Sequence, residues 1–70
     1  MLNKIEFKVE MAKHSDTQRT VATAMGVTAQ TVGDKLKGPA EFKRSEIEKL
    51  IRYWNLSGDR TLEIFFATEA

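Results

Sequence analysis

Apolar residues in the second half of the chain recur three or four positions apart, the spacing of one face of an α-helix. A first helical segment begins near Ser45, which has capping-box spacing to Glu48. Its inward-facing residues are Ile47, Leu50, Ile51 and Trp54. A second segment can be capped by Ser57 or Asp59. Its apolar residues are Leu62, Phe65 and Phe66. The pattern predicts two amphipathic helices.

Two shorter helices are predicted in the middle of the chain. Thr17 can cap the first, and Gly26 supplies the left-handed conformation that commonly ends a helix. Thr28 can cap the second, whose inward residues are Val32 and Leu36. Two short helices are therefore joined by three or four residues that include a glycine, which is the geometry of a helix-turn-helix.

The first segment, KIEFKVEM, has two interpretations. Its strict alternation of polar and apolar residues is the period of a half-buried strand. Its Lys, Glu and Met residues are good helix formers, and a lone strand would have no partner along this chain. We therefore expect a helix. The chain is predicted to be one all-α domain over residues 1–70, a compact bundle of about five helices with a helix-turn-helix at about 17–37.

Composition argues against several kinds of site. With no cysteine and a single histidine, His14, the chain offers no credible metal-ligand set. Ser15, Ser45 and Ser57 occupy cap positions without a nearby general base, so we expect no enzyme, cofactor or small-molecule ligand. No apolar run approaches the roughly 20 residues needed to cross a membrane, and the start MLNKIEF lacks the apolar middle of a signal peptide. We expect a cytoplasmic protein.

Charge is unevenly distributed although the net charge is only +1. Residues 1–12 are balanced. Residues 13–44 carry six basic and three acidic side chains, and residues 45–70 carry three basic and five acidic ones. The division suits a molecule with one basic face and one neutral or acidic face.

The order of helix, glycine turn, helix and two supporting helices suits DNA recognition, because the B-form major groove, about 12 Å wide, accepts one helix. The chain resembles the lambda-type repressor and Cro family, specifically over residues 17–38 and loosely over residues 3–66. The stretch DKLKGPAEFKRSEIEKL is similar to small phage regulators of this family. The matching residues are Gln18, Ala22, Gly26, Val27, Val32 and Gly38.

The resemblance implies which residues read bases, since the family uses the first turns of the second motif helix. Gln30 there can pair with adenine. Gly33 costs about 1 kcal/mol relative to alanine inside a helix, which indicates either a close approach to DNA or simple tolerance. Asp34 can accept a hydrogen bond from cytosine, oppose binding, or pair with Lys37, and the local pair is favoured. The implied base-reading residues are Thr28, Ala29, Gln30, Gly33 and Asp34.

A second implied set contacts phosphate. Gln18 stands where the family uses a glutamine at a helix N-terminus to bind a phosphate. Cations cluster at the end of the second motif helix and in the following loop, and binding through them weakens with salt. The predicted phosphate-binding residues are Gln18, Arg19, Lys35, Lys37, Lys43 and Arg44.

The last helix carries the predicted contact with another chain. Phe65 and Phe66 are adjacent and point about 100° apart on a helix, so they cannot both face one core. Palindromic operators need two reading helices about 34 Å apart, which favours a homodimer, at least on DNA. One of the two phenylalanines, or Ile64, is therefore expected to contact another subunit, so the candidate interface residues are Ile64, Phe65 and Phe66. The same surface could equally bind a different protein. The remaining large apolar side chains, expected in the core, are Trp54, Leu56 and Leu62.

Together these features predict a Cro-like phage or prophage repressor that acts in a bacterial host cell by occupying an operator in double-stranded DNA. The alternative is an antirepressor or modulator that binds another phage regulator through the same fold without reading DNA. The near-neutral net charge, the small Ala29 and the acidic Asp34 favour this alternative.

Overall fold

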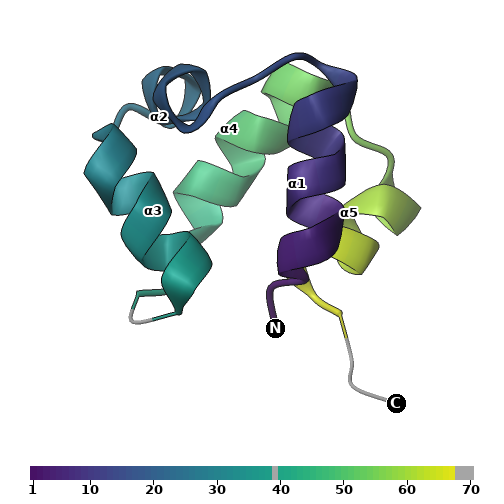
Figure 1. Ribbon diagram of the computed structural model, residues 1–70. Coiled ribbons are helices and arrows are strands. Elements are labelled where there is room, and N and C mark those ends of the chain that lie inside the picture. The colour runs from purple at the N-terminus through teal and green to yellow at the C-terminus, as the bar shows by residue number, and fades with distance from the viewer. Residues whose placement is uncertain (39, 68–70) are drawn as a thin grey trace.

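The computed structural model describes residues 1–38 and 40–67, and these form five α-helices with no strand among them. The predicted all-α bundle is confirmed, including a helix for the first segment. The helices are α1 (Lys4–Lys13), α2 (Gln18–Met25), α3 (Ala29–Lys37), α4 (Arg44–Trp54) and α5 (Gly58–Phe65). Figure 1 shows α2 and α3 on one side of α4, and α1 with α5 on the other.

Side-chain caps explain where most of these helices begin. Asn3 accepts a hydrogen bond from the backbone N–H of Glu6 at the start of α1. Thr17 and Thr20 exchange two hydrogen bonds at the start of α2, and Ser57 caps α5 as one of the two predicted residues. The N-terminal signals of these segments are therefore local.

Helix α4 begins two residues earlier than the predicted capping box implies. Its N-cap is Lys43, which has no side-chain oxygen to accept a hydrogen bond. Glu46 instead reaches back, and its Oε1 accepts the Lys43 backbone N–H at 2.8 Å. The Ser45–Glu48 box is therefore wrong, because Ser45 already lies inside the first turn.

The core is formed around Phe7, which is fully buried. The Phe7 ring lies 5.3 Å from Trp54, 6.0 Å from Phe65 and 5.2 Å from Phe42, measured between ring centroids. Trp54 is buried as predicted. The other buried apolar residues are Val21, Ala22, Met25, Val32, Leu36, Ile47, Leu50, Ile64 and Phe65. Leu62 was expected in the core and is 57% exposed, so that prediction is wrong.

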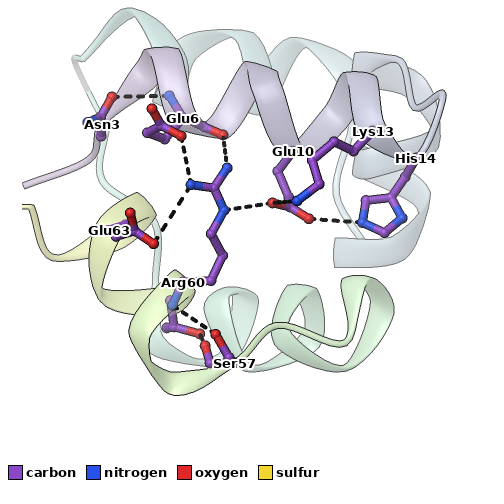
Figure 2. A network of polar contacts seen from close by, with 9 residues as sticks. Asn3, Glu6, Glu10, Lys13, His14, Ser57, Arg60 and Glu63 are labelled. Atoms are coloured by element: carbon purple, nitrogen blue, oxygen red, sulfur yellow. Dashed lines mark hydrogen bonds and ion pairs between the residues drawn. The ribbon is translucent and has the colours of Figure 1, made fainter.

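A polar network joins α5 to α1 (Figure 2). The Arg60 guanidinium donates to Glu6 Oε1 at 2.6 Å and to Glu10 Oε1 at 2.8 Å. His14 Nε2 lies 2.9 Å from the other oxygen of Glu10, and Lys13 Nζ lies 3.5 Å from Oε1. Burial works to raise the pKa of Glu10, but the hydrogen bonds from Arg60 and His14 and the nearby positive charges outweigh it and hold the pKa below its ordinary value. Glu10 is thus a buried carboxylate kept ionised by its partners.

A second polar cluster attaches the connection between α1 and α2 to α4. Asp16 accepts hydrogen bonds from Trp54 Nε1 at 2.8 Å, from the Tyr53 hydroxyl at 2.7 Å and from Thr20 Oγ1 at 2.6 Å. Partial burial acts to raise the pKa of Asp16, and these three donors together with His14 lower it below the ordinary value. The start of α2 is therefore fixed against the end of α4.

Within the described ranges, every helix is too short or too polar to cross a lipid bilayer.

Candidate nucleic-acid interface

The candidate interface is built on α2, a glycine turn and α3. Gly26 adopts a left-handed conformation with φ of 74°, and the backbone N–H of Val27 bonds back to the Ala22 carbonyl at 2.9 Å. This is the hydrogen bond with which a left-handed glycine closes a helix end. Thr28 then caps α3 through the backbone N–H of Thr31 at 3.1 Å. Only three residues therefore separate the end of α2 from the start of α3.

Apolar packing fixes the angle between the two helices. Val21, Ala22 and Met25 on α2 are buried together with Val32 and Leu36 on α3. Side chains three and four positions apart in α3 thus face inward, which leaves the opposite side of the helix to solvent. The glycine turn and the inward-facing Val32 and Leu36 are those predicted.

The exposed side of α3 carries the predicted base-reading residues. Ala29, Gln30 and Asp34 are exposed, and Gly33 is half-buried. Thr28 is exposed too, but its hydroxyl already takes part in hydrogen bonds to Thr31. The residues therefore share one surface, while the Thr28 hydroxyl has less capacity left for a base than the sequence implied.

Gly33 lies under the side chain of Gln18. A β-carbon at Gly33 would come 3.4 Å from Gln18 Oε1, which is close van der Waals contact with the end of a flexible side chain. The Gln18 amide therefore lies against α3 at Gly33, and an alanine at this position would fit with at most a small movement of the Gln18 side chain.

Asp34 does not form the favoured local pair. Among the described residues the ion pairs include none between Asp34 and Lys37, although both side chains are exposed. Asp34 therefore presents an uncompensated carboxylate on the same surface as Gln30.

Four of the predicted phosphate-binding cations are exposed. Arg19 lies in the first turn of α2, Lys37 ends α3, Lys43 caps α4, and Arg44 begins it. Arg44 pairs with Glu48 at 3.3 Å, but its side chain is 93% exposed, so the pair holds it weakly. Gln18 is exposed as well. These residues remain available to an anionic partner.

Lys35 is not available, which corrects the prediction for this residue. Its side chain is only 5% exposed, and its Nζ lies 2.9 Å from Glu46 Oε1 and 2.8 Å from the Glu41 carbonyl oxygen. Burial acts to raise the pKa of Glu46, whereas the hydrogen bonds from the Lys43 backbone and from Lys35 hold it below the ordinary value. The lysine stabilises the connection between α3 and α4 and is removed from the phosphate-binding set.

Two further lysines lie beside the helix-turn-helix and were missed. Lys49 on α4 donates to the Met25 carbonyl at 3.3 Å, where α2 ends, and Lys4 on α1 donates to the Lys37 carbonyl at 3.4 Å, where α3 ends. These partners are 24 and 33 residues apart in sequence. Only the tertiary arrangement brings them together, so no local signal could have revealed them.

The three predicted partner-binding residues differ in exposure: two are buried and one is exposed. Ile64 is fully buried and Phe65 is 5% exposed, so both belong to the core of the single chain and the prediction is wrong for them. Phe66, which directly follows the last residue of α5, is 52% exposed, and Leu62, four positions earlier on α5, is exposed as well. The apolar surface of α5 is therefore Leu62 and Phe66.

Comparison with protein-family models, curated proteins and solved structures gave no match to this chain.

Proposed function

We propose that the protein binds double-stranded DNA sequence-specifically as a Cro-like transcriptional repressor. The observation that carries the proposal is the solvent-facing side of α3, which presents Gln30 beside the Gln18 end of α2, with inward residues fixing the angle of the two helices. A short helix held across a second helix in this way fits the major groove.

In the proposed complex, bases are contacted by the first turns of α3. The Gln30 amide can donate to and accept from one adenine, and the Ala29 methyl can rest against a thymine methyl. Gln18 and the free backbone N–H groups at the start of α2 bind a phosphate. Occupancy of an operator that overlaps a promoter then blocks transcription.

Exposed cations supply the part of the affinity that does not depend on sequence. They flank α3 at its C-terminal end and at the start of α2, and each phosphate contact contributes about −0.9 to the slope of log affinity against log salt. The contributing side chains are Arg19, Lys37, Lys43 and Arg44.

The test is selection of bound duplexes from a random pool, followed by salt titration of the selected duplex. Gln30→Ala is expected to relax preference at one or two base pairs at a cost of about 1–3 kcal/mol. Lys37→Gln is expected to weaken all duplexes alike. Arg52→Gln, which removes the same charge from an exposed position in the last turn of α4, is the matched control. Lack of any duplex binding at low salt would overturn the proposal.

A homodimer formed through Leu62 and Phe66 is part of the proposal. Both side chains are large, apolar and exposed, and α5 lies across the molecule from α3 (Figure 1). Phe66→Ser is expected to lower the mass of the protein–DNA complex that sedimentation measures on a palindromic duplex. Ile5→Ser is the control, because Ile5 is an apolar residue of α1 that is 73% exposed, and it should leave that mass unchanged. Equal loss of dimer in both variants would argue against this surface.

The alternative function is binding to another regulator protein. It is favoured by the Asp34 carboxylate, which has no ion-pair partner among the described residues and lies on the surface of α3 that would face the DNA. If the chain binds no duplex but Asp34→Asn abolishes its effect on a regulated promoter in cells, the protein-binding role replaces the DNA-binding one.

A further inference from the structure

Lys4 is brought to the C-terminal end of α3 by the tertiary fold. Its Nζ donates to the backbone carbonyl oxygen of Lys37 at 3.4 Å, in an exposed contact between the first residue of α1 and the last residue of α3. Figure 1 shows the N-terminal end of α1 and the C-terminal end of α3 at the same end of the molecule. Two lysines from distant segments therefore adjoin one another.

The surroundings leave these charges largely uncompensated. The carbonyl end of a helix carries about half a negative charge, which attracts the Lys4 ammonium but does not neutralise two cations. Among the described residues, neither Lys4 nor Lys37 has an ion-pair partner. A polyanion that approached this end of α3 would supply the missing counter-charge.

Lys8 continues the same side of α1. It follows Lys4 by four residues, which on a helix is a displacement of about 6 Å along the axis and about 40° around it. Lys8 is exposed and has no ion-pair partner in the described part of the chain, and Phe7 and Glu10 point from α1 into the core instead. The three lysines thus form a track that begins at the end of α3 and runs along α1.

We infer that Lys4 and Lys8 bind phosphates of the same DNA duplex whose groove α3 enters, so that the interface extends from the helix-turn-helix onto α1. This inference rests on the proposed function, and it names a part of the surface outside the motif. In this complex the Lys4 ammonium donates a hydrogen bond to the Lys37 carbonyl at the end of α3, and the same contact holds its positive charge at that end of the helix.

The experiment is a salt titration of the selected duplex with the full chain and five variants, of which Lys37→Gln tests the helix-turn-helix itself. Lys4→Gln and Lys8→Gln are each expected to make the slope of log affinity against log salt less negative by about 1, and the double variant by about 2. The preferred base sequence should not change. Arg52→Gln, with the same loss of net charge, should leave the slope as in the unaltered chain.

The outcomes separate this inference from the proposed function. If Lys8→Gln and the double variant behave like Arg52→Gln while Lys37→Gln still makes the slope less negative, α1 does not touch DNA and only the further inference is wrong. Because the Lys8 side chain forms no hydrogen bond or ion pair with the described residues, a change of slope in that variant is not explained by a loosened α3. If the unaltered chain binds no duplex at low salt, both the inference and the proposed function are wrong.

Discussion

The α2–α3 unit and the α1–α5 pair are held together by different chemistry. Between α2 and α3 the buried residues are apolar, and the connection is closed by backbone hydrogen bonds around Gly26. Between α1 and α5 the central side chain is Arg60, bound to Glu6 and to the buried Glu10. The α1–α5 pair thus places an ionic network between its helices, whereas Lys35 is the one buried charged side chain among the described residues of α2 and α3 and is paired with Glu46 on α4.

The two regions also differ in how the charges of a chain of net charge +1 are paired. Between α1 and α5, Arg60 is paired with Glu6 and Glu10, and Glu63 adds a weak contact at 4.0 Å, whereas Lys4 and Lys8 of α1 have no ion-pair partner among the described residues. On α3 the buried Lys35 is neutralised by Glu46, but Lys37 is not paired among the described residues. The pairing of individual charged side chains therefore says more about where cations are available than the net charge of the chain does.

Removal of Arg60 should produce the largest effect. Arg60→Met leaves the Glu10 carboxylate buried with only His14 and Lys13 beside it, and we expect a loss of about 3 kcal/mol in the free energy of unfolding, the low end for a broken buried ion pair. Urea unfolding followed by circular dichroism measures it. Arg52→Met is the matched control, because Arg52 is exposed and lies in no ion pair of the described residues.

A double variant separates buried charge from lost packing. Arg60→Met combined with Glu10→Leu removes both ions, and replacement of a buried pair by apolar groups is often neutral. The double variant should therefore recover much of the stability lost in the single one. A single variant that loses less than about 1 kcal/mol would show that the network behaves as surface charge.

Acid should weaken the α1–α5 side and the α4 contacts by a smaller amount. The pKa values of Glu10 and Glu46 lie below their ordinary 4.5 and that of Asp16 below its ordinary 3.8. A depressed folded-state pKa contributes stability that is complete above the unfolded value and is lost as the pH falls through the folded value. The urea midpoint should therefore stay level from pH 7 to about 5 and fall below pH 4.5.

Two variants assign this pH dependence. Glu10→Gln should be less stable than the unaltered chain at pH 7, and its midpoint should fall less steeply with acid because one shifted carboxylate is missing. Glu48→Gln changes an exposed carboxylate and should keep the full acid dependence. A parallel fall in all three proteins would mean that other groups control acid unfolding.

The helix-turn-helix could be predicted from the sequence because its signals are local. Thr17, Gly26 and Thr28 act within a few residues of their own positions, and the confirmed inward residues Val32 and Leu36 follow from helical spacing. The helix of the first segment needed one further argument, that a single strand lacks a partner. Its buried residues are Phe7 and Glu10, a spacing that fits a helix and not the alternation of a strand.

The residues whose roles were predicted wrongly are those that contact segments far away in the sequence. Lys35 is a helix-end cation by sequence, and it is buried because Glu46 and the Glu41 carbonyl meet it. Ile64 and Phe65 were expected at an interface, but α1 packs over that side of α5, with the Asn3 N–H bonded to the Ile64 carbonyl at 2.7 Å. No spacing rule within one helix contains this information.

The turn between α2 and α3 should show an effect of about 1–2 kcal/mol, smaller than that of Arg60. Gly26→Ala places a side chain on a backbone with φ of 74°, where alanine costs roughly that amount. The new β-carbon would meet only Lys49 Nζ at 3.5 Å, so the cost is conformational and not steric. Gly58→Ala is the control, since a β-carbon there meets open space and φ is not positive. Equal unfolding free energies for the two variants would contradict a strained turn.

The smallest expected effect is a gain of stability on the candidate interface itself. Gly33→Ala removes a flexible residue from the interior of α3, and alanine is favoured there by about 0.5–1 kcal/mol. The gain is opposed only by contact with Gln18 Oε1 at 3.4 Å, which a flexible side chain can relieve. In a Gln18→Ala background the same substitution should gain slightly more, because nothing then has to move. Both comparisons need urea unfolding at neutral pH. If Gly33→Ala is destabilising in the native background and stabilising without Gln18, the amide is held rigidly over α3, and the interface is more ordered than an exposed glutamine implies.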